Sequence, residues 1–322
     1  MKTLSVIIPC YNEEVNISHF YKAFMTAWSD PRLSKLDYEL VFIDDGSRDQ
    51  TVAELQKLIA QDSKVKLIEF SRNFGKEVAL SAGVENCIGD GAIFVDADLQ
   101  YPIDRVPDFV EKWLSGADVV VGIRDKKKTN NLIEKFGSSM FYKIINSISD
   151  TKIIPGALDF RLIDRVVIDE YNRFSERGRM TRALIDWLGF KRDYIHYQEL
   201  PRLYGEPAYS FSKRVKLALS TFVSQSLLPL KLAGYLGLLI FIISGLLGIF
   251  IIVQSYILGD PLNLRISGSA SLGILNSFMV SIILMCLGLI ALYIANIHTE
   301  VANRPLYVVR KIYQKTAKKT KA

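Results

Sequence analysis

The sequence predicts an α/β protein with a mostly parallel sheet, followed by a C-terminal part that enters a membrane. Two observations lead to this fold class. Short runs of Val, Ile, Leu and Phe alternate with helix-like stretches in the first two thirds of the chain, and two long uncharged stretches follow. Apolar strands separated by helices are typical of a parallel sheet covered on both faces. With 49% hydrophobic and 23% charged residues in 322, the composition excludes a disordered chain.

The N-terminal region 1–212 is predicted to form one catalytic domain. Its apolar runs predict strands, and the stretches between them carry apolar residues at helical spacing. The expected strands are 4–9, 38–43, 65–70, 92–98 and 117–123, and the clearest expected helices are 16–28 and 51–61.

The C-terminal region contains two candidate transmembrane helices. Residues 232–253 form a stretch of 22 residues without an ionisable side chain, which as a helix spans roughly 33 Å and so matches a hydrocarbon core of about 30 Å. Residues 272–296 form a second uncharged stretch, and 254–271 form the loop between the two. The alternative, a buried helical hairpin, seldom stays apolar on every face for six turns.

Basic residues flank both stretches, whereas the only charged residues in the loop between them are Asp260 and Arg265. This asymmetry predicts a multi-pass protein of the cell membrane, with the catalytic domain and both termini in the cytoplasm. Residues 213–231 are predicted to form a juxtamembrane amphipathic helix, and 297–322 a basic cytoplasmic tail. Residues 126–148 read either as an amphipathic segment at the bilayer or as an ordinary packed helix.

Three widely spaced cysteines and three histidines predict neither a disulfide framework nor a zinc site. Any metal chemistry would therefore use carboxylates. A dinucleotide-binding GxGxxG motif and a phosphate loop of the GxxxxGK[ST] type are both absent from the sequence. Hydride-transfer enzymes and P-loop NTPases thus lose support, and no nucleic-acid partner is expected.

Polar clusters follow the ends of the predicted strands, where open α/β sheets bind their ligands. One such cluster could be a simple turn before a helix, but four on successive strands are harder to explain in that way. They are Asn12-Glu13-Glu14, Asp44-Asp45-Gly46-Ser47, Asn73 with Lys76, and Asp96-Ala97-Asp98.

The string DADLQ at 96–100 is the most informative local motif. Two carboxylates one residue apart at a strand end can both turn toward a hard divalent cation, Mg²⁺ or Mn²⁺, that also bridges phosphates. Asp96 and Asp98 are the expected metal ligands, and Gln100 could add a third contact. Such a metal would cancel the charge that a nucleoside diphosphate leaving group gains.

Six segments in order resemble the family-2 inverting glycosyltransferases that act on polyprenyl phosphate, the group of dolichol-phosphate mannose synthase and the bactoprenol glucosyltransferases. The resemblance covers about residues 1–230, and the two uncharged stretches match its membrane-anchored bacterial branch. Two departures are visible: Ala157-Leu158 replaces the usual Gly before Asp-Phe-Arg, and GEPAY lacks the Lys of the late Gly-Glu-Ser/Thr-Lys-Tyr element. The six segments are PCYNEE (9–14), FIDDGSRDQT (42–51), SRNFGKEVAL (71–80), DADLQYP (96–102), ALDFRLID (157–164) and RLYGEPAYS (202–210).

The resemblance implies a GT-A fold and a set of site residues. It places the nucleotide sugar against one group of residues, and the lipid phosphate or the donor diphosphate against three arginines. Lys76 could instead be solvated, Glu13 could be a first-turn helix carboxylate, and Arg161 could pair with Asp159 or Asp164. The nucleotide-sugar group is Pro9, Tyr11, Glu13, Asp45, Lys76 and Asp96, and the arginines are Arg124, Arg161 and Arg202.

The resemblance also makes Asp159, together with Asp98, a catalytic residue. The acceptor is a phosphate monoester with a second pKa of about 6, so it is largely a dianionic nucleophile near neutral pH. Asp159 therefore acts either as a base or by orienting Arg161 and the acceptor.

The expected activity is that of a membrane-bound hexosyltransferase, which moves one hexose from a nucleotide sugar to polyprenyl (undecaprenyl) phosphate for cell-envelope glycan modification. UDP-glucose is the favoured donor, and UDP-N-acetylglucosamine or GDP-mannose are the alternatives. A processive polysaccharide synthase is less favoured, because the chain lacks a Q-x-x-R-W element. An inactive membrane-anchored binding protein is less favoured, because the chain retains Asp45, Asp96, Asp98 and Asp159. The oligomeric state stays open, a homo-oligomer included.

Overall fold

The computed structural model describes residues 1–125, 154, 156–176, 179–198, 200, 242, 246, 249, 250, 253 and 268–315. The chain divides into two compact units, residues 1–208 with 304–322, and residues 209–303. The first unit contains the sheet, and the second contains the long helix α10 (Gly268–Val301).

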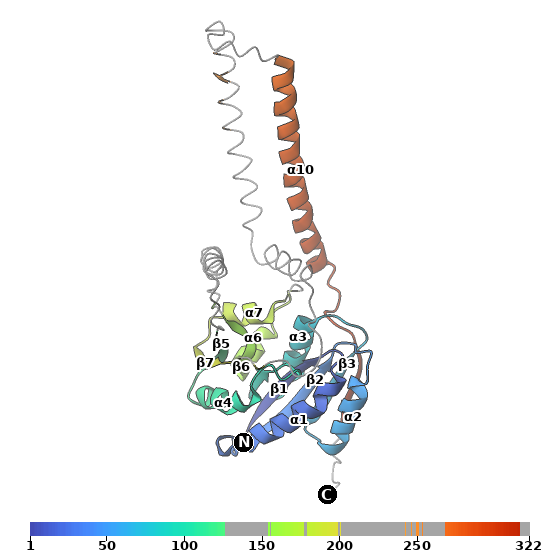
Figure 1. Ribbon diagram of the computed structural model, residues 1–322, viewed down its shortest axis with the longest axis vertical. Helices are drawn as coiled ribbons and strands as arrows, with labels where there is room; N and C mark the ends of the chain where they lie inside the picture. Colours follow the sequence, from blue (N-terminus) through green and yellow to red (C-terminus); the bar gives the residue numbers. More distant parts are fainter. Residues whose placement is uncertain are drawn as a thin grey trace. The chain divides into compact units, whose positions relative to one another are not determined.

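An eight-stranded sheet forms the centre of the first unit, in the order β7-β5-β6-β4-β1-β2-β3-β8 (Figure 1). Strands β4, β1, β2 and β3 run parallel to one another, as do β5 and β7, whereas β6 and β8 are antiparallel to their neighbours. The strands are β1 (Lys2–Cys10), β2 (Leu36–Asp44), β3 (Val65–Phe70), β4 (Gly91–Phe94), β5 (Val119–Arg124), β6 (Ala157–Asp164), β7 (Arg192–Tyr197) and β8 (Val309–Gln314).

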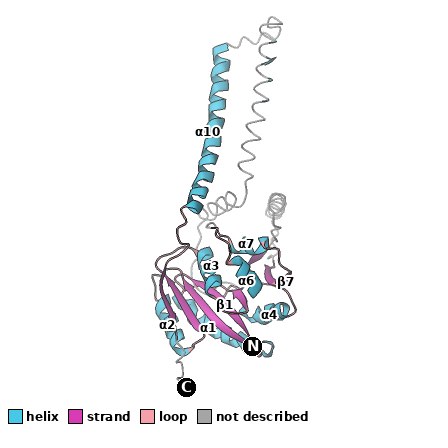
Figure 2. Cartoon of the chain, turned by 180° about the vertical axis from the view of Figure 1, so that it is seen from behind, coloured by secondary structure: helices cyan, strands magenta, loops and turns pink. Residues whose placement is uncertain are grey.

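Helices cover both faces of this sheet, and Figure 2 shows the strands in magenta among them. One face carries α1 (Glu14–Trp28), α2 (Thr51–Gln61) and α4 (Val106–Leu114), whose buried side chains join one apolar cluster. The other face carries α3 (Lys76–Asn86), α6 (Arg165–Tyr171) and α7 (Thr181–Trp187), which join a second cluster. The short 3-10 helices η1 (Pro31–Leu33) and η2 (Ile103–Arg105) lie in connections.

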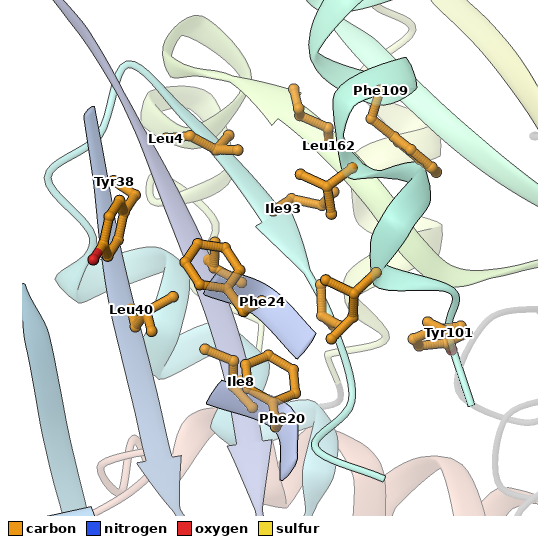
Figure 3. Packing of buried hydrophobic residues seen from close by; sticks show 14 of the residues in the cluster. Leu4, Ile8, Phe20, Phe24, Tyr38, Leu40, Ile93, Tyr101, Phe109 and Leu162 are labelled. Atoms are coloured by element: carbon orange, nitrogen blue, oxygen red, sulfur yellow. The ribbon is translucent and has the colours of Figure 1, made fainter. Parts of the chain in front are cut away.

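Side chains of β1 alternate between the two clusters, as the pleat of a strand requires. Leu4 and Ile8 pack on the α1 side together with Phe20 and Phe24 (Figure 3). Ile7 packs on the α3 side. Residues 4–8 of this strand are all buried, which explains why all of them except Ser5 are apolar.

The five expected strands and the two expected helices are all present, with ends shifted by at most a few residues. The α/β class and the mostly parallel sheet are thus confirmed. Strand β6 was not expected as a strand, because DFRL places charged residues inside it; its central residues are nevertheless buried.

The predicted basic tail 297–322 needs a correction, because residues 309–314 form β8 and extend the sheet. β8 pairs antiparallel with β3, and Arg310 Nη1 and Tyr313 Oη lie 3.1 and 3.0 Å from the Glu69 carboxylate. Tyr307, just before β8, stacks on Phe70 with ring centroids 4.9 Å apart. Basic residues are common on edge strands, and here they interrupt the apolar pattern by which a strand is recognised in the sequence.

The predicted amphipathic segment 126–148, the juxtamembrane helix 213–231 and almost all of the first apolar stretch 232–253 lie outside the described residues. Helix α10 contains the second apolar stretch and has 34 residues. Among the residues that the structure describes, no helix meets the combined requirements of length and apolar character for crossing a membrane.

Candidate active site

The polar clusters predicted from the sequence do meet at the carboxyl end of the parallel strands. β1 and β2 end level with each other, because Cys10 pairs with Asp44, and Ile7 of β1 lies opposite Phe94 at the end of β4. The residues that follow these strands therefore share one edge of the sheet.

Asp45 follows β2 and fixes the loop that leads into α3. Its two carboxylate oxygens accept hydrogen bonds from the backbone N–H groups of Phe74 (2.6 Å) and Gly75 (2.9 Å). Burial raises the pKa of Asp45, and these two hydrogen bonds partly offset that effect. Gly46 has φ +72°, and a Cβ there would lie 2.5 Å from the backbone of Arg72, so this turn requires glycine. Asp45 thus determines where α3 begins.

Hydrogen bonds join the loops that follow β1 and β2. The backbone N–H of Asn12 donates to Ser47 Oγ at 2.9 Å, and the Asn12 side chain accepts from the backbone N–H of Arg48 at 2.9 Å. Asp44 is buried and accepts from the N–H of Ser47 at 3.1 Å, so the predicted turn is also present. Asn12 itself adopts φ +56°, one of three such residues other than glycine in the described chain.

Other predicted nucleotide-site residues lie beside these loops. Pro9 is half-buried in β1, and Tyr11 is 42% exposed. Glu13 directly precedes α1; its N–H donates to Thr51 Oγ1 at 2.8 Å, and its carboxylate accepts from Asn16 at 2.5 Å. Glu13 therefore lies next to the first turn of α1, close to where the first-turn alternative places it.

Lys76, the first residue of α3, lies between two carboxylates. Its Nζ is 2.7 and 2.8 Å from the two oxygens of Asp96, and 3.3 Å from Asp159 Oδ2. Burial opposes the ammonium charge, but Asp96 and Asp159 together raise the pKa of Lys76 well above its ordinary value. Lys76 is thus paired with two carboxylates, although 36% of its side chain stays exposed.

The two carboxylates in contact with Lys76 differ in their titration. Burial raises the pKa of Asp96 despite the contact with Lys76. Burial also disfavours the charged form of Asp159, but the positive charges of Lys76, Arg182 and Arg161 outweigh it and lower the pKa. Asp159 is therefore a carboxylate at neutral pH.

The predicted metal motif follows β4. Asp98 is buried and accepts from the backbone N–H of Gln100 at 3.1 Å. Leu99 between them adopts φ +60°, a strained backbone conformation for a branched residue, and such strain concentrates at functional sites. The half-buried Gln100 accepts at its backbone oxygen from the N–H of Leu200 at 3.1 Å.

Two carboxylates and an amide match a divalent cation that phosphates help to coordinate. They do not form a complete protein cage, since no group of three or more His, Cys, Asp or Glu side chains that could hold a metal occurs among the described residues. The donor set thus fits a metal that binds together with a nucleotide.

Arg161 lies in β6, two residues after Asp159, and is 1% exposed. Its guanidinium donates to the backbone oxygens of Leu158 and Arg182 and lies 3.3 Å from Asp186 Oδ1. Burial lowers its pKa, although Asp186 and Asp159 counteract this. The sequence suggested Asp159 or Asp164 as the partner of Arg161. The carboxylate that it hydrogen-bonds is that of Asp186 instead.

The structure describes one of the other two predicted arginines. Arg124 ends β5 and is exposed, and its backbone N–H donates to Gly156 O at 2.9 Å. Arg202 lies outside the described residues.

Sequence reasoning missed Arg182, which lies on α7 with Nη1 3.9 Å from Asp159 Oδ1. No motif includes it, and only the packing of α7 against β6 reveals its place. The described site is therefore a row of alternating charges: Asp96, Lys76, Asp159 and Arg182.

A strand-end constellation of carboxylates on an α/β sheet suits an enzyme that acts on a phosphate-bearing substrate. Comparison with known proteins identifies the class. Residues 5–171 match the glycosyl transferase family 2, and the chain belongs to this family and is a glycosyltransferase.

The chain also has relatives of nearly its own length. The uncharacterized glycosyltransferase YkcC of Bacillus subtilis is 37% identical over 309 residues, which are 96% of this chain and 94% of YkcC. The bactoprenol glucosyl transferase of Shigella phage SfII is 35% identical over 311 residues, 97% of this chain and 98% of the relative. This relationship agrees with the GT-A-like fold expected from the sequence.

Among solved structures, the mannosyltransferase PcManGT of Pyrobaculum calidifontis, in complex with GDP-Man and Mn²⁺, is 20% identical. The alignment covers 67% of this chain and 60% of PcManGT, with a TM-score of 0.47. So distant a likeness says nothing about the ligands of this chain.

Proposed function

We propose that this protein transfers one hexose, with glucose favoured, from a nucleotide sugar to polyprenyl phosphate at the cytoplasmic face of a membrane. One observation carries the proposal: the similarity to the bactoprenol glucosyl transferase of phage SfII extends over 311 residues of a 322-residue chain. A match of that length includes both the carboxylate site and the apolar C-terminal region.

The donor nucleotide sugar would bind at the ends of β1, β2 and β4. The loops around Asp45 supply a surface for the nucleotide, and Lys76 beside Asp96 supplies a positive charge for the diphosphate. Proposed donor contacts are Pro9, Tyr11, Glu13, Asp45, Lys76 and Asp96.

Asp96, Asp98 and Gln100 would hold Mg²⁺ or Mn²⁺. When bound, such a cation neutralises the negative charge that the departing nucleoside diphosphate gains. Lys76, which contacts both oxygens of Asp96, would also contact a phosphate oxygen of the donor.

In the proposed reaction, a bond forms between an oxygen of the lipid phosphate and C1 of the sugar. The bond between C1 and the diphosphate breaks with inversion, and the nucleoside diphosphate leaves with the bonding electrons. The acceptor phosphate is largely dianionic near neutral pH, so little proton removal is needed. The lowered pKa of Asp159 favours a role in orienting charged groups over one as a strong base.

The proposed anchoring in the membrane rests on the sequence and on the acceptor rather than on the described helices. Residues 232–253 and 272–296 lack formal charges, and basic residues are concentrated on their outer flanks. A polyprenyl phosphate stays in the bilayer, so an enzyme that uses it has to work at the membrane surface.

The test is to incubate membranes containing the full chain with undecaprenyl phosphate and, separately, UDP-glucose, UDP-N-acetylglucosamine or GDP-mannose. We expect a hexosyl lipid with UDP-glucose, identified by mass spectrometry, and no product from an Asp98→Asn variant or in excess chelator. A product with another donor would correct the sugar only. Failure with all three donors, in membranes where the protein is folded and still binds UDP, would refute the acceptor class.

A further inference from the structure

We propose that Arg182 binds the phosphate group of the acceptor. This inference rests on the proposed function and extends it by naming a residue that no motif contains. It follows from the contacts of the positive charges around Asp159, from a gap in one ion pair, and from the way α7 is held.

Three positive side chains surround Asp159, and two of them are committed to protein carboxylates. Arg161 is 1% exposed and interacts with Asp186 and two backbone oxygens. Lys76 contacts both oxygens of Asp96 within 2.8 Å. The Arg182 side chain is 38% exposed, and within the described part of the chain its one ion pair is with Asp159, at 3.9 Å.

The ion pair of Arg182 and Asp159 is open. A distance of 3.9 Å between Nη1 and Oδ1 exceeds that of a hydrogen bond. Asp159 Oδ1 is buried and has no hydrogen-bond partner among the residues described. Within the described part of the chain, Arg182 therefore keeps guanidinium donors that a negatively charged ligand can use.

A phosphate monoester has the required chemistry. Its oxyanions accept hydrogen bonds from a guanidinium, which can present two donors to one phosphate. A neutral sugar hydroxyl could satisfy Asp159 but would make little use of the Arg182 charge.

The position of Arg182 is fixed through its backbone by two charged side chains. Arg161 Nη1 donates to the backbone oxygen of Arg182 at 3.2 Å. Glu77, which follows Lys76 on α3, accepts from the backbone N–H of Thr181 at 2.8 Å. Buried Arg161 therefore acts as a positioning residue, in place of the direct phosphate contact expected from the sequence.

The order of the charges separates the acceptor from the donor. Lys76 contacts Oδ2 of Asp159 and also Asp96, whereas Arg182 contacts Oδ1. The donor diphosphate belongs with Asp96 at one end of the row, which leaves Arg182 at the other end for the acceptor phosphate.

Binding measurements with the full chain in detergent micelles test this assignment. Geranyl phosphate serves as a short acceptor probe, geraniol as its control without phosphate, and UDP as the probe of the donor site; affinities are measured by isothermal titration calorimetry. The variants are Arg182→Ala and Arg182→Lys. Arg173→Ala is the matched control, since Arg173 is 75% exposed and pairs with Glu170.

We expect Arg182→Ala to weaken geranyl phosphate binding at least tenfold, with UDP affinity and geraniol binding changed less than twofold. Arg182→Lys should lose about threefold or more, because an ammonium gives one point charge instead of a fork of donors; it also serves as the test if the Ala variant does not fold. Arg173→Ala should match the wild type.

Three outcomes would overturn the inference. Unchanged geranyl phosphate binding in both Arg182 variants would show that Arg182 is not a ligand. A loss of UDP affinity would assign Arg182 to the donor diphosphate instead. If the wild type binds UDP but not geranyl phosphate, the proposed acceptor class fails, and the role of Arg182 fails with it.

Discussion

Lys76 lies at the centre of the described site, because its ammonium group contacts two carboxylates. The sequence suggested a diphosphate contact or a solvated helix residue, and the structure shows an ammonium 2.7 Å from Asp96 and 3.3 Å from Asp159. Asp45 places Lys76 by holding the N–H groups of the two preceding residues. Asp45 thus helps to fix the position of the lysine that pairs with Asp96 and Asp159.

Lys76→Met should change the pH dependence of the reaction. Lys76 lowers the pKa of Asp159, so in the variant that pKa rises. If Asp159 has to be ionised, activity is lost as the pH falls through its pKa, and the acid limb of kcat/KM should move to higher pH. We also expect a fall in kcat/KM of at least about tenfold, since a charge at the diphosphate is lost.

The measurement is the pH profile of kcat/KM, with Lys57→Met as the control because Lys57 pairs with Glu54 on the surface of α2. The acceptor phosphate titrates identically with both enzymes, so a difference between their acid limbs comes from the protein. An unchanged acid limb in Lys76→Met would contradict the view that Lys76 keeps an essential carboxylate, Asp96 or Asp159, ionised.

At the scale of elements, β8 joins the C-terminal region to the catalytic sheet. Besides its ladder with β3, it provides both side chains that hydrogen-bond the nearly buried Glu69 carboxylate, those of Arg310 and Tyr313. Glu69 pairs in register with Asp44; burial is the main cause that raises the pKa of Asp44, and the Glu69 charge adds to it. The strand therefore influences the carboxyl end of β2 as well as the edge of the sheet.

Deletion of residues 309–322 should destabilise the catalytic unit by about 2–4 kcal/mol, from lost cross-strand contacts and a buried carboxylate left without partners. Deletion of 316–322 is the matched control, because it leaves β8 complete. Thermal unfolding of the two truncated proteins would show the difference. Equal midpoints would mean that β8 adds nothing to stability. The exposed edge of β3 should also promote aggregation.

At the scale of the whole molecule, the arrangement of charges along the chain predicts its orientation. Lys22 on α1 is exposed, whereas Cys10 and Cys87 are buried and should react slowly. A membrane-impermeant maleimide added to intact cells should label Ser267→Cys, placed in the predicted outer loop, and should label Lys22→Cys only after permeabilisation. Labelling of Lys22→Cys in intact cells would reverse the proposed orientation.

The sequence by itself determined the α/β class, the positions of the first five strands along the chain and the family. These features depend on local patterns: mostly apolar runs for buried strands, and Asp45, Asp96 and Asp98 placed where those strands end. Because parallel strands bring their carboxyl ends to one edge, a local pattern was enough to predict a shared site.

Only the tertiary structure decided which charges meet. Arg182 and Asp159 are 23 positions apart, Lys76 and Asp159 are 83 apart, and β8 pairs with a strand more than 240 residues earlier. Such contacts depend on how α7 packs on β6 and on where the chain returns to the sheet, and no local pattern encodes either. For the same reason the motif alone did not show that Arg161 is buried next to Asp186.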